Sequence, residues 1–239
     1  MDTATLFTLW DQGCGQPPVQ RALCLLAAAW PERAYAGWAE VSIGERDEYL
    51  LRLRERLFGQ QLQCVATCPN CAQALELSFE TTQIRASAPL PALPLAMEAD
   101  GYSLSFRLPN SGDLLDALEQ PESQRCRRLM VRCVMSASKQ GEAVAAAQLP
   151  DALLAQLSDH LAVLDPQASV ELALVCHSCA HQWSTLFDIL SYLWGEIEDW
   201  GERLLLDIHA LALAYGWSER DILALSPQRR QRYLAMIGA

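Results

Sequence analysis

Two segments, CPNCAQALELSF at Cys68–Phe79 and CHSCAHQWSTLF at Cys176–Phe187, repeat one pattern in distant parts of the chain. Each reads Cys-x-x-Cys-Ala, continues with an apolar residue four positions after the second cysteine, and has a phenylalanine four positions further on. The matching positions are Cys68 with Cys176, Cys71 with Cys179, Ala72 with Ala180, Leu75 with Trp183, and Phe79 with Phe187. A repeat that extends beyond the cysteines indicates two copies of one structural unit.

The residues around each cysteine pair alternate as β-strands do. The segment 61–68, QLQCVATC, precedes the first pair, and 74–84, ALELSFETTQI, follows it. The segment 169–176, SVELALVC, leads into the second pair with the same period of two. Each cysteine pair is therefore expected in a turn between strands.

The paired turns fit a zinc site. Structural zinc prefers four ligands at the corners of a tetrahedron, and one Cys-x-x-Cys turn supplies two of them. The long segment between the turns adds little cost, because loop-closure entropy grows only logarithmically with length. We therefore predict one structural Zn²⁺ ion held by Cys68, Cys71, Cys176 and Cys179.

Other interpretations of the cysteines stay open. The four residues could be reduced and buried, or a site that has lost its metal. A redox role is disfavoured because the βαβ context of such motifs is missing. Catalytic zinc is disfavoured because it needs an open position and usually His or carboxylate ligands, so His177 and His181 are expected to be neighbours only. The other cysteines are expected to be small core residues: Cys14, Cys24, Cys64, Cys126 and Cys133.

Composition limits the class of partner. The net charge is −11, which disfavours a nucleic-acid backbone as the main partner, because such binding needs clustered positive charge. A zinc-ribbon regulator that binds nucleic acid is therefore the alternative function and not the first choice. Hydrophobic residues make up 51% of the chain, so a substantial core is expected.

The sequence shows no sign of secretion, membrane insertion or catalysis. Its start, MDTATLFTLWDQGCG, lacks the basic and apolar regions of a signal peptide, and no stretch is long and apolar enough for a membrane span. Nine cysteines are an odd number for a disulfide framework, so a reducing, cytoplasmic location is expected. No phosphate-binding glycine loop or Gly-x-Ser-x-Gly motif is present, so we expect neither an enzyme nor a small-molecule substrate.

Several further elements are expected on either side of the first cysteine pair. Ser42 and Glu45 form a capping-box signature before a helix that stops at Gly59. The proline-rich segment 87–98 is expected to be a connector and neither helix nor strand. Helices are expected at 17–30, 110–119, 122–137 and 150–164, and a strand at 101–108.

Everything after Phe187 has helical periodicity. Apolar residues recur every three or four positions as far as Tyr215, which predicts a long helix ending at Gly216, with two short helices after Ser218 and Ser226. The part 204–215 is apolar almost all round, so it must be covered on several sides, by its own domain or by a partner. The candidate partner-binding residues on this arm are Trp194, Trp200, Trp217, Leu225 and Tyr233.

These elements predict an α+β fold. A small antiparallel zinc-knuckle β core at 61–187 would carry a helical insertion at about 109–165. N-terminal helices at 1–60 and a long helical C-terminal arm at 188–239 would complete one cooperative unit.

The chain also resembles a known family. The segments that carry the resemblance, mostly from Gly44 onward, are GERDEYLLRLRERLFG, CPNC, FRLPNSGDL, LDPQASVELALVCHSCAHQW, FDILSYLWGEIEDW and AYGWSERDILALSPQRRQRYLAMI. They are similar to T-even-type baseplate hub proteins of contractile phage tails and related contractile injection systems. The resemblance implies a non-enzymatic structural or assembly protein whose partners are other baseplate, hub or tail proteins. It also implies a cytoplasmic protein that can enter a tail-like particle.

Overall fold

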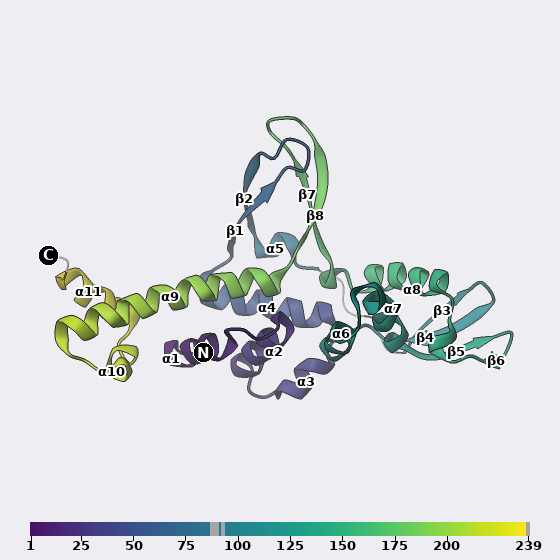
Figure 1. Ribbon diagram of the computed structural model, residues 1–239, viewed down its shortest axis with the longest axis horizontal. Helices are drawn as coiled ribbons and strands as arrows, with labels where there is room; N and C mark the ends of the chain where they lie inside the picture. Colours follow the sequence, from purple (N-terminus) through teal and green to yellow (C-terminus); the bar gives the residue numbers. More distant parts are fainter. Residues whose placement is uncertain (87–90, 92–93, 238–239) are drawn as a thin grey trace. The chain divides into compact units, whose positions relative to one another are not determined.

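The computed structural model describes residues 1–86, 91 and 94–237. The chain divides into two compact units, 1–31 with 190–239, and 32–189. Helices and small antiparallel sheets occur together, as Figure 1 shows, which confirms the α+β class. The predicted division at 60/61 and 187/188 stays a prediction.

The unit 32–189 begins with helices α3 (Tyr35–Glu40) and α4 (Ile43–Phe58). The Ser42 hydroxyl accepts the Glu45 N–H at 3.1 Å, as the capping signature predicts, while the Glu45 carboxylate pairs with Arg33 at 2.8 Å. Gly59 ends α4 with a φ of 89°, a conformation that glycine adopts without strain.

The start of α4 is fixed by a buried carboxylate. Asp165 is 1% exposed, and its Oδ2 accepts the Gly44 N–H at 2.9 Å. A Cβ on residue 44 would lie 1.7 Å from Asp165 Oδ1, so only glycine leaves room for this contact. Burial raises the pKa of Asp165 and raises that of Asp47 to about 6, even though the neighbouring Arg46 favours the charged form of Asp47.

A four-stranded antiparallel sheet in the order β3-β4-β5-β6 packs against helices of this unit. Its strands are β3 (Leu95–Ala99), β4 (Tyr102–Phe106), β5 (Val134–Lys139) and β6 (Glu142–Ala143). Helices α6 (Ser111–Leu118), α7 (Glu122–Cys133) and α8 (Asp151–Leu164) accompany it. Leu104, Phe106 and Leu108 are buried on one side of the chain, as the alternation predicted, and join Met130, Leu153 and Leu157 in one core.

Three expectations for this unit are wrong. The helix predicted over 122–137 ends at Cys133, because Val134–Lys139 pairs with β4 as a strand. The strand predicted to Ile84 ends at Glu80, where Glu80 and Gln83 form a capping box for α5 (Thr81–Ile84). The predicted connector 87–98 contains strand β3 from Leu95 onward, and its residues 87–90 and 92–93 lie outside the described part.

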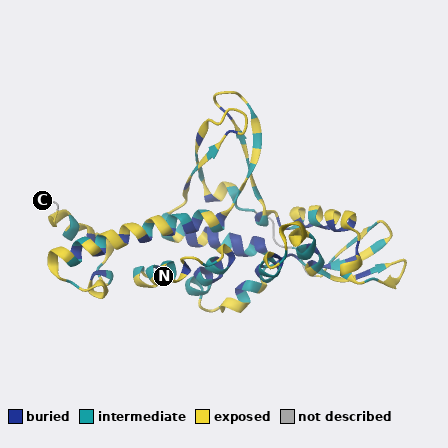
Figure 2. Cartoon of the chain, viewed as in Figure 1, coloured by how far each residue is buried: buried dark blue, intermediate teal, exposed yellow. Residues whose placement is uncertain are grey.

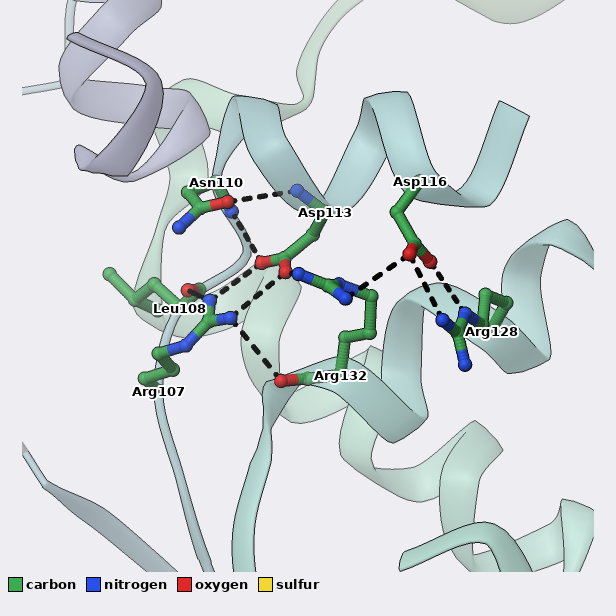
Figure 3. A network of polar contacts seen from close by, with 7 residues as sticks. All are labelled: Arg107, Leu108, Asn110, Asp113, Asp116, Arg128 and Arg132. Carbon is green, nitrogen blue, oxygen red and sulfur yellow. Dashed lines mark hydrogen bonds and ion pairs between the residues drawn. The ribbon is translucent and has the colours of Figure 1, made fainter. Parts of the chain in front are cut away.

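An ion-pair network joins α6 to α7, as Figure 3 shows. Asp113 is fully buried and accepts from Arg107 at 2.6 and 2.9 Å, from Arg132 at 2.8 Å, and from the backbone N–H of Asn110 at 3.1 Å. Asp116 accepts from Arg128 at 2.5 and 2.9 Å and from Arg132 at 3.2 Å. Burial alone would raise the pKa of Asp113, but the hydrogen bonds from the two arginines hold it below its usual value.

The unit formed by 1–31 and 190–239 is helical in its described part. It contains α1 (Thr3–Gly13), α2 (Pro18–Ala29), α9 (Ile189–Tyr215), α10 (Glu219–Leu223) and α11 (Pro227–Ile237). The predicted helix 17–30, the long arm and both short C-terminal helices are confirmed, whereas α1 was not predicted. Its start is fixed by Asp2, whose carboxylate accepts the Thr5 N–H at 2.8 Å.

Two glycines let the helices of this unit approach closely. A Cβ on Gly201 of α9 would lie 2.4 Å from the Trp10 ring, and one on Gly13 of α1 would lie 2.2 Å from the Trp194 ring. These distances are shorter than any van der Waals contact, so a side chain at either position would push an indole out of its place.

Gly201→Ala is therefore expected to lower the free energy of unfolding by about 1–3 kcal/mol through overpacking. Gly195→Ala, in the same helix but with nothing within 4 Å of its added Cβ, is the matched control. It should raise stability by up to about 1 kcal/mol, because alanine favours helix more than glycine does. Urea denaturation followed by circular dichroism measures both, and equal effects of the two substitutions would contradict the packing argument.

Candidate metal centre

Two β-hairpins of the unit 32–189 end in the cysteine turns (Figure 1). One consists of β1 (Gln61–Thr67) and β2 (Ala74–Glu80), and the other of β7 (Val170–Val175) and β8 (Gln182–Phe187). In the described part of the chain each hairpin is a separate two-stranded sheet. Because an isolated two-stranded hairpin is only marginally stable in water, the two need each other or a further link.

The two turns have the same backbone geometry. In the first, Cys68 N–H donates to the Gln73 carbonyl and Ala72 N–H to the Cys68 carbonyl, both at 2.9 Å. In the second, Cys176 and Ala180 donate to His181 and Cys176 at the same distances. Ala72 has a φ of 59° and Ala180 a φ of 57°, so the repeated alanine marks a left-handed residue in each turn. The sequence repeat is thus a repeat of local structure.

The turns bring all four predicted cysteines together. Their sulfur atoms all lie within 4.8 Å of one another, with Cys68 Sγ 3.7 Å from Cys179 Sγ and Cys71 Sγ 3.6 Å from Cys176 Sγ. In a tetrahedral site with Zn–S bonds of about 2.3 Å, neighbouring sulfurs are about 3.8 Å apart. The donor set and its spacing therefore allow a metal ion to be held between the two hairpins.

The cysteines differ in exposure and acidity. Cys68 and Cys176 are each 1% exposed, whereas Cys71 and Cys179 face solvent. The Asn70 amide donates to Cys179 Sγ at 3.5 Å and is the main reason that the pKa of this thiol falls to about 6. At Cys71 the backbone N–H of Gln73 lowers the pKa, but hydrogen bonds with the neighbouring cysteine sulfurs outweigh it and raise the pKa to about 12. Because thiols must lose their protons to bind a metal, metal binding at this cluster would release protons.

Apolar side chains of the hairpins pack against the buried cysteines of the cluster. Leu75, Leu77 and Trp183 pack against Cys68 and Cys176. Figure 2 shows the alternating burial along these strands, with one face of each hairpin turned inward.

The far ends of the hairpins are also in contact. The rings of Phe79 and Phe187 meet edge to face with their centroids 5.9 Å apart. The apolar and phenylalanine positions of the repeat are therefore the places where the hairpins touch.

The two histidines beside the second turn are outside the cluster. His181 stacks on Trp183 with a centroid distance of 6.0 Å, and His177 is exposed.

Of the cysteines expected in the core, Cys133 is buried, Cys24 and Cys64 are partly buried, and Cys14 and Cys126 are exposed. The core expectation is wrong for Cys14 and Cys126. Cys14 follows the end of α1 and Cys126 lies in α7, and both side chains are on the solvent-exposed side.

Replacing the left-handed alanines by glycine tests the shared turn geometry. Ala72→Gly and Ala180→Gly are each expected to stabilise the protein by up to about 1 kcal/mol, because glycine adopts a positive φ without the clash of a Cβ. Valine at either position should destabilise by more than glycine stabilises. Urea denaturation of the metal-loaded protein measures both, and a loss of stability with glycine would contradict the assigned geometry.

The residues predicted to bind a partner lie mostly inside their own unit. Trp194 is 6% exposed and packs on Arg21, whose guanidinium lies 4.4 Å from the ring centroid. Trp200, Trp217 and Tyr233 are partly buried around Leu204 and Ile208, and Leu225 is partly buried. Their partner role stays a prediction.

The exposed apolar residues of α9 are different ones. Leu206 is 68% exposed and Leu213 is 75% exposed. Their spacing of seven places them on one face of the helix, and the apolar run at 204–215 is the only sequence signal for it. The sequence reasoning expected the run 204–215 to be covered, but it did not name Leu206 or Leu213 among the candidate partner-binding residues.

Within the described residues, no helix has the length and apolarity that crossing a membrane requires. No curated protein and no solved structure gives a significant match to the chain. A sequence model described as T4 bacteriophage base plate protein matches residues 32–194, which is more than half of the chain and includes both hairpins and all four clustered cysteines. As its sequence resemblance predicted, the chain belongs to the T4 bacteriophage base plate protein family.

Proposed function

We propose that this chain is a non-enzymatic hub or assembly protein of the baseplate of a contractile tail-like machine, with one structural zinc ion. The observation that carries the proposal is the four-cysteine cluster, which lies between two hairpins that share no strand pairing in the described residues, inside the segment that matches the baseplate family. Family membership implies partners among other baseplate or tail proteins. The ligands proposed for zinc are Cys68, Cys71, Cys176 and Cys179.

Zinc is the metal that the donors favour. Four thiolates at tetrahedral spacing suit zinc or iron–sulfur chemistry, and they do not suit magnesium or calcium, which prefer oxygen. A site closed by four protein ligands leaves no open position, so the ion would stabilise the fold and would not bind a substrate. Elemental analysis of protein purified without chelator should find one zinc per chain, and metal-free or iron-loaded protein would refute this part of the proposal.

The C-terminal arm is proposed as the surface that meets another baseplate or tail component. Its exposed face carries Leu206 and Leu213, and Met236 and Ile237 of α11 are also exposed. Exposed apolar residues gathered on one helix face are typical of an interaction site. Of the candidate residues from the sequence, Trp200, Trp217 and Tyr233 pack in the cluster formed by Leu204, Ile208, Leu211 and Ile222, whereas Trp194 and Leu225 lie outside that cluster.

Leu206→Glu combined with Leu213→Glu is expected to abolish co-purification of the chain with its baseplate partners. The charges would be buried without counter-charges at the interface, while the free protein would keep its fold because both positions are exposed. Val163→Glu, at a 77% exposed apolar position of α8, is the matched control and should co-purify normally. Unchanged co-purification of the doubly substituted protein would exclude this face.

The role in assembly can be tested separately. Deletion of the gene, followed by electron microscopy of the particles, should show tails without complete baseplates. Mass spectrometry of purified wild-type particles then distinguishes a resident hub subunit, which is present, from an assembly factor, which is absent. Normal, functional particles after deletion would contradict both roles.

A further inference from the structure

A groove lies between the two hairpins, away from the cysteine cluster. It has a volume of about 750 Å³ and is lined by Glu76–Phe79 of β2, by Ser169 with the first five residues of β7, and by 83–86. Its inner side chains are apolar: Leu77, Phe79, Val170, Leu172 and Leu174 are all partly buried. The whole length of β7 up to Leu174 forms one wall of this groove.

The wall formed by β7 is a free sheet edge. In the described part of the chain β7 pairs with β8 alone. The Cys176 N–H donates to the His181 carbonyl, so 176 and 181 are a hydrogen-bonded pair. Such pairs alternate in an antiparallel ladder, so residues 170, 172 and 174 bond to β8. Glu171 and Ala173 must then turn their N–H and C=O groups away from β8, and both residues are exposed.

We propose that this edge of β7 binds an extended segment of another baseplate or tail protein as an added β-strand. Free N–H and C=O groups at the spacing of a strand are matched by the backbone of another strand. Every second side chain of the added strand would enter the groove and pack on Leu77, Phe79 and Leu172. The incoming segment therefore alternates, with apolar residues on its inner side.

The charges beside the groove determine which residues are favoured on the outward side of the added strand. Glu171 lies on the exposed side of β7, and Glu76 lies on the facing wall of the groove. The groove's arginine, Arg85, is already paired with Glu55 at 2.9 Å. Opposite charges favour cross-strand pairing and like charges oppose it, so the outward residues of the partner strand are lysine or arginine. The proposal rests on the hairpin pair of the proposed metal site and is independent of the C-terminal arm.

The probe is the acetylated and amidated peptide KVKVKVK, added to the full-length, metal-loaded protein and followed by NMR. The amide signals of Glu171 and Ala173 should shift in a saturable way, and the EVEVEVE peptide should bind at least about tenfold more weakly. Ala173→Pro removes an outward N–H and should weaken binding by about tenfold. Ser184→Pro is the matched control, because Ser184 faces Ala173 across the hairpin and turns its N–H to the opposite edge. It should leave the dissociation constant unchanged.

Further measurements keep the test decisive if a proline variant unfolds. A KVKVKVK peptide with N-methyl groups on alternate residues probes the unaltered protein and should lose binding, because its backbone donors are blocked. Metal content measured in each sample separates failure of this proposal from failure of the zinc site. The proposal is overturned by absent binding in zinc-loaded protein, by equal binding of the methylated or acidic peptide, or by equal loss in both proline variants. It is also overturned if exchange protection shows Glu171 already covered by the chain itself, or if sedimentation shows a dimer that Ala173→Pro dissociates.

Discussion

Cys71→Ser and Cys179→Ser are each expected to abolish zinc binding and to lower the free energy of unfolding by more than about 3 kcal/mol. Structural zinc contributes on the order of 10 kcal/mol to the folding of small zinc domains, because the site does not exist in the unfolded chain. Here the ion would join two hairpins that share no strand pairing in the described part of the chain. Without it, the contacts of Leu75, Leu77, Trp183 and the two phenylalanine rings are left to hold them together.

A double-mutant cycle tests whether the repeats form one site. Cys68→Ser and Cys176→Ser come from different turns, yet their sulfurs lie in one cluster. Each single substitution should therefore lose the metal, and the double variant should be little less stable than either single one. Additive losses would indicate two independent sites. Cys126→Ser, at an exposed cysteine outside the cluster, is the matched control and should keep both metal and stability.

The repeat was predictable because its local chemistry is complete in the sequence. One strand on each side of a Cys-x-x-Cys turn defines a hairpin, and the equal spacing of Leu75 with Trp183 and of Phe79 with Phe187 predicts equivalent packing. The structure brings the four cysteines together as expected. The pattern could not predict that the alanine after each pair adopts a positive φ, because alanine carries no preference for that region.

The errors occur where tertiary contacts decide the local structure. Residues 134–137 continue the helical spacing of 122–133, but Val134–Lys139 pairs with β4, and the sheet overrides the helical pattern. The exposed face of α9 could not be predicted for a different reason, because the sequence does not tell which side of an apolar helix is buried. The sequence shows that 204–215 is apolar almost all round, but only the structure distinguishes the buried Leu204 and Leu211 from the exposed Leu206 and Leu213.

Asp113→Asn is expected to lower the free energy of unfolding by about 2–4 kcal/mol at pH 7. Asp113 is fully buried and accepts hydrogen bonds from Arg107 and Arg132. An amide of the same shape would keep one acceptor for the Asn110 N–H, but it would leave the two guanidinium groups without their counter-charge. The arginine side chains are 29% and 36% exposed, so water would compensate them in part and keep the loss below that of a fully buried pair.

The pH dependence of this difference separates the lost charge from a packing defect. Because the pKa of Asp113 is lower in the folded protein than in the unfolded chain, its contribution is fully present above about pH 4 and is lost as pH falls through the folded-state pKa. The gap between wild type and Asp113→Asn should therefore shrink below about pH 4. If acid releases the proposed zinc ion, the loss of stability would be the same in both proteins and would cancel in the difference.

Asp151→Asn is the control: it breaks the ion pair with Arg127 at a carboxylate that is 84% exposed, and it should cost no more than about 1 kcal/mol at any pH. Urea denaturation at a series of pH values measures these differences, and a gap for Asp113→Asn that persists unchanged in acid would show that shape, and not charge, makes this aspartate necessary.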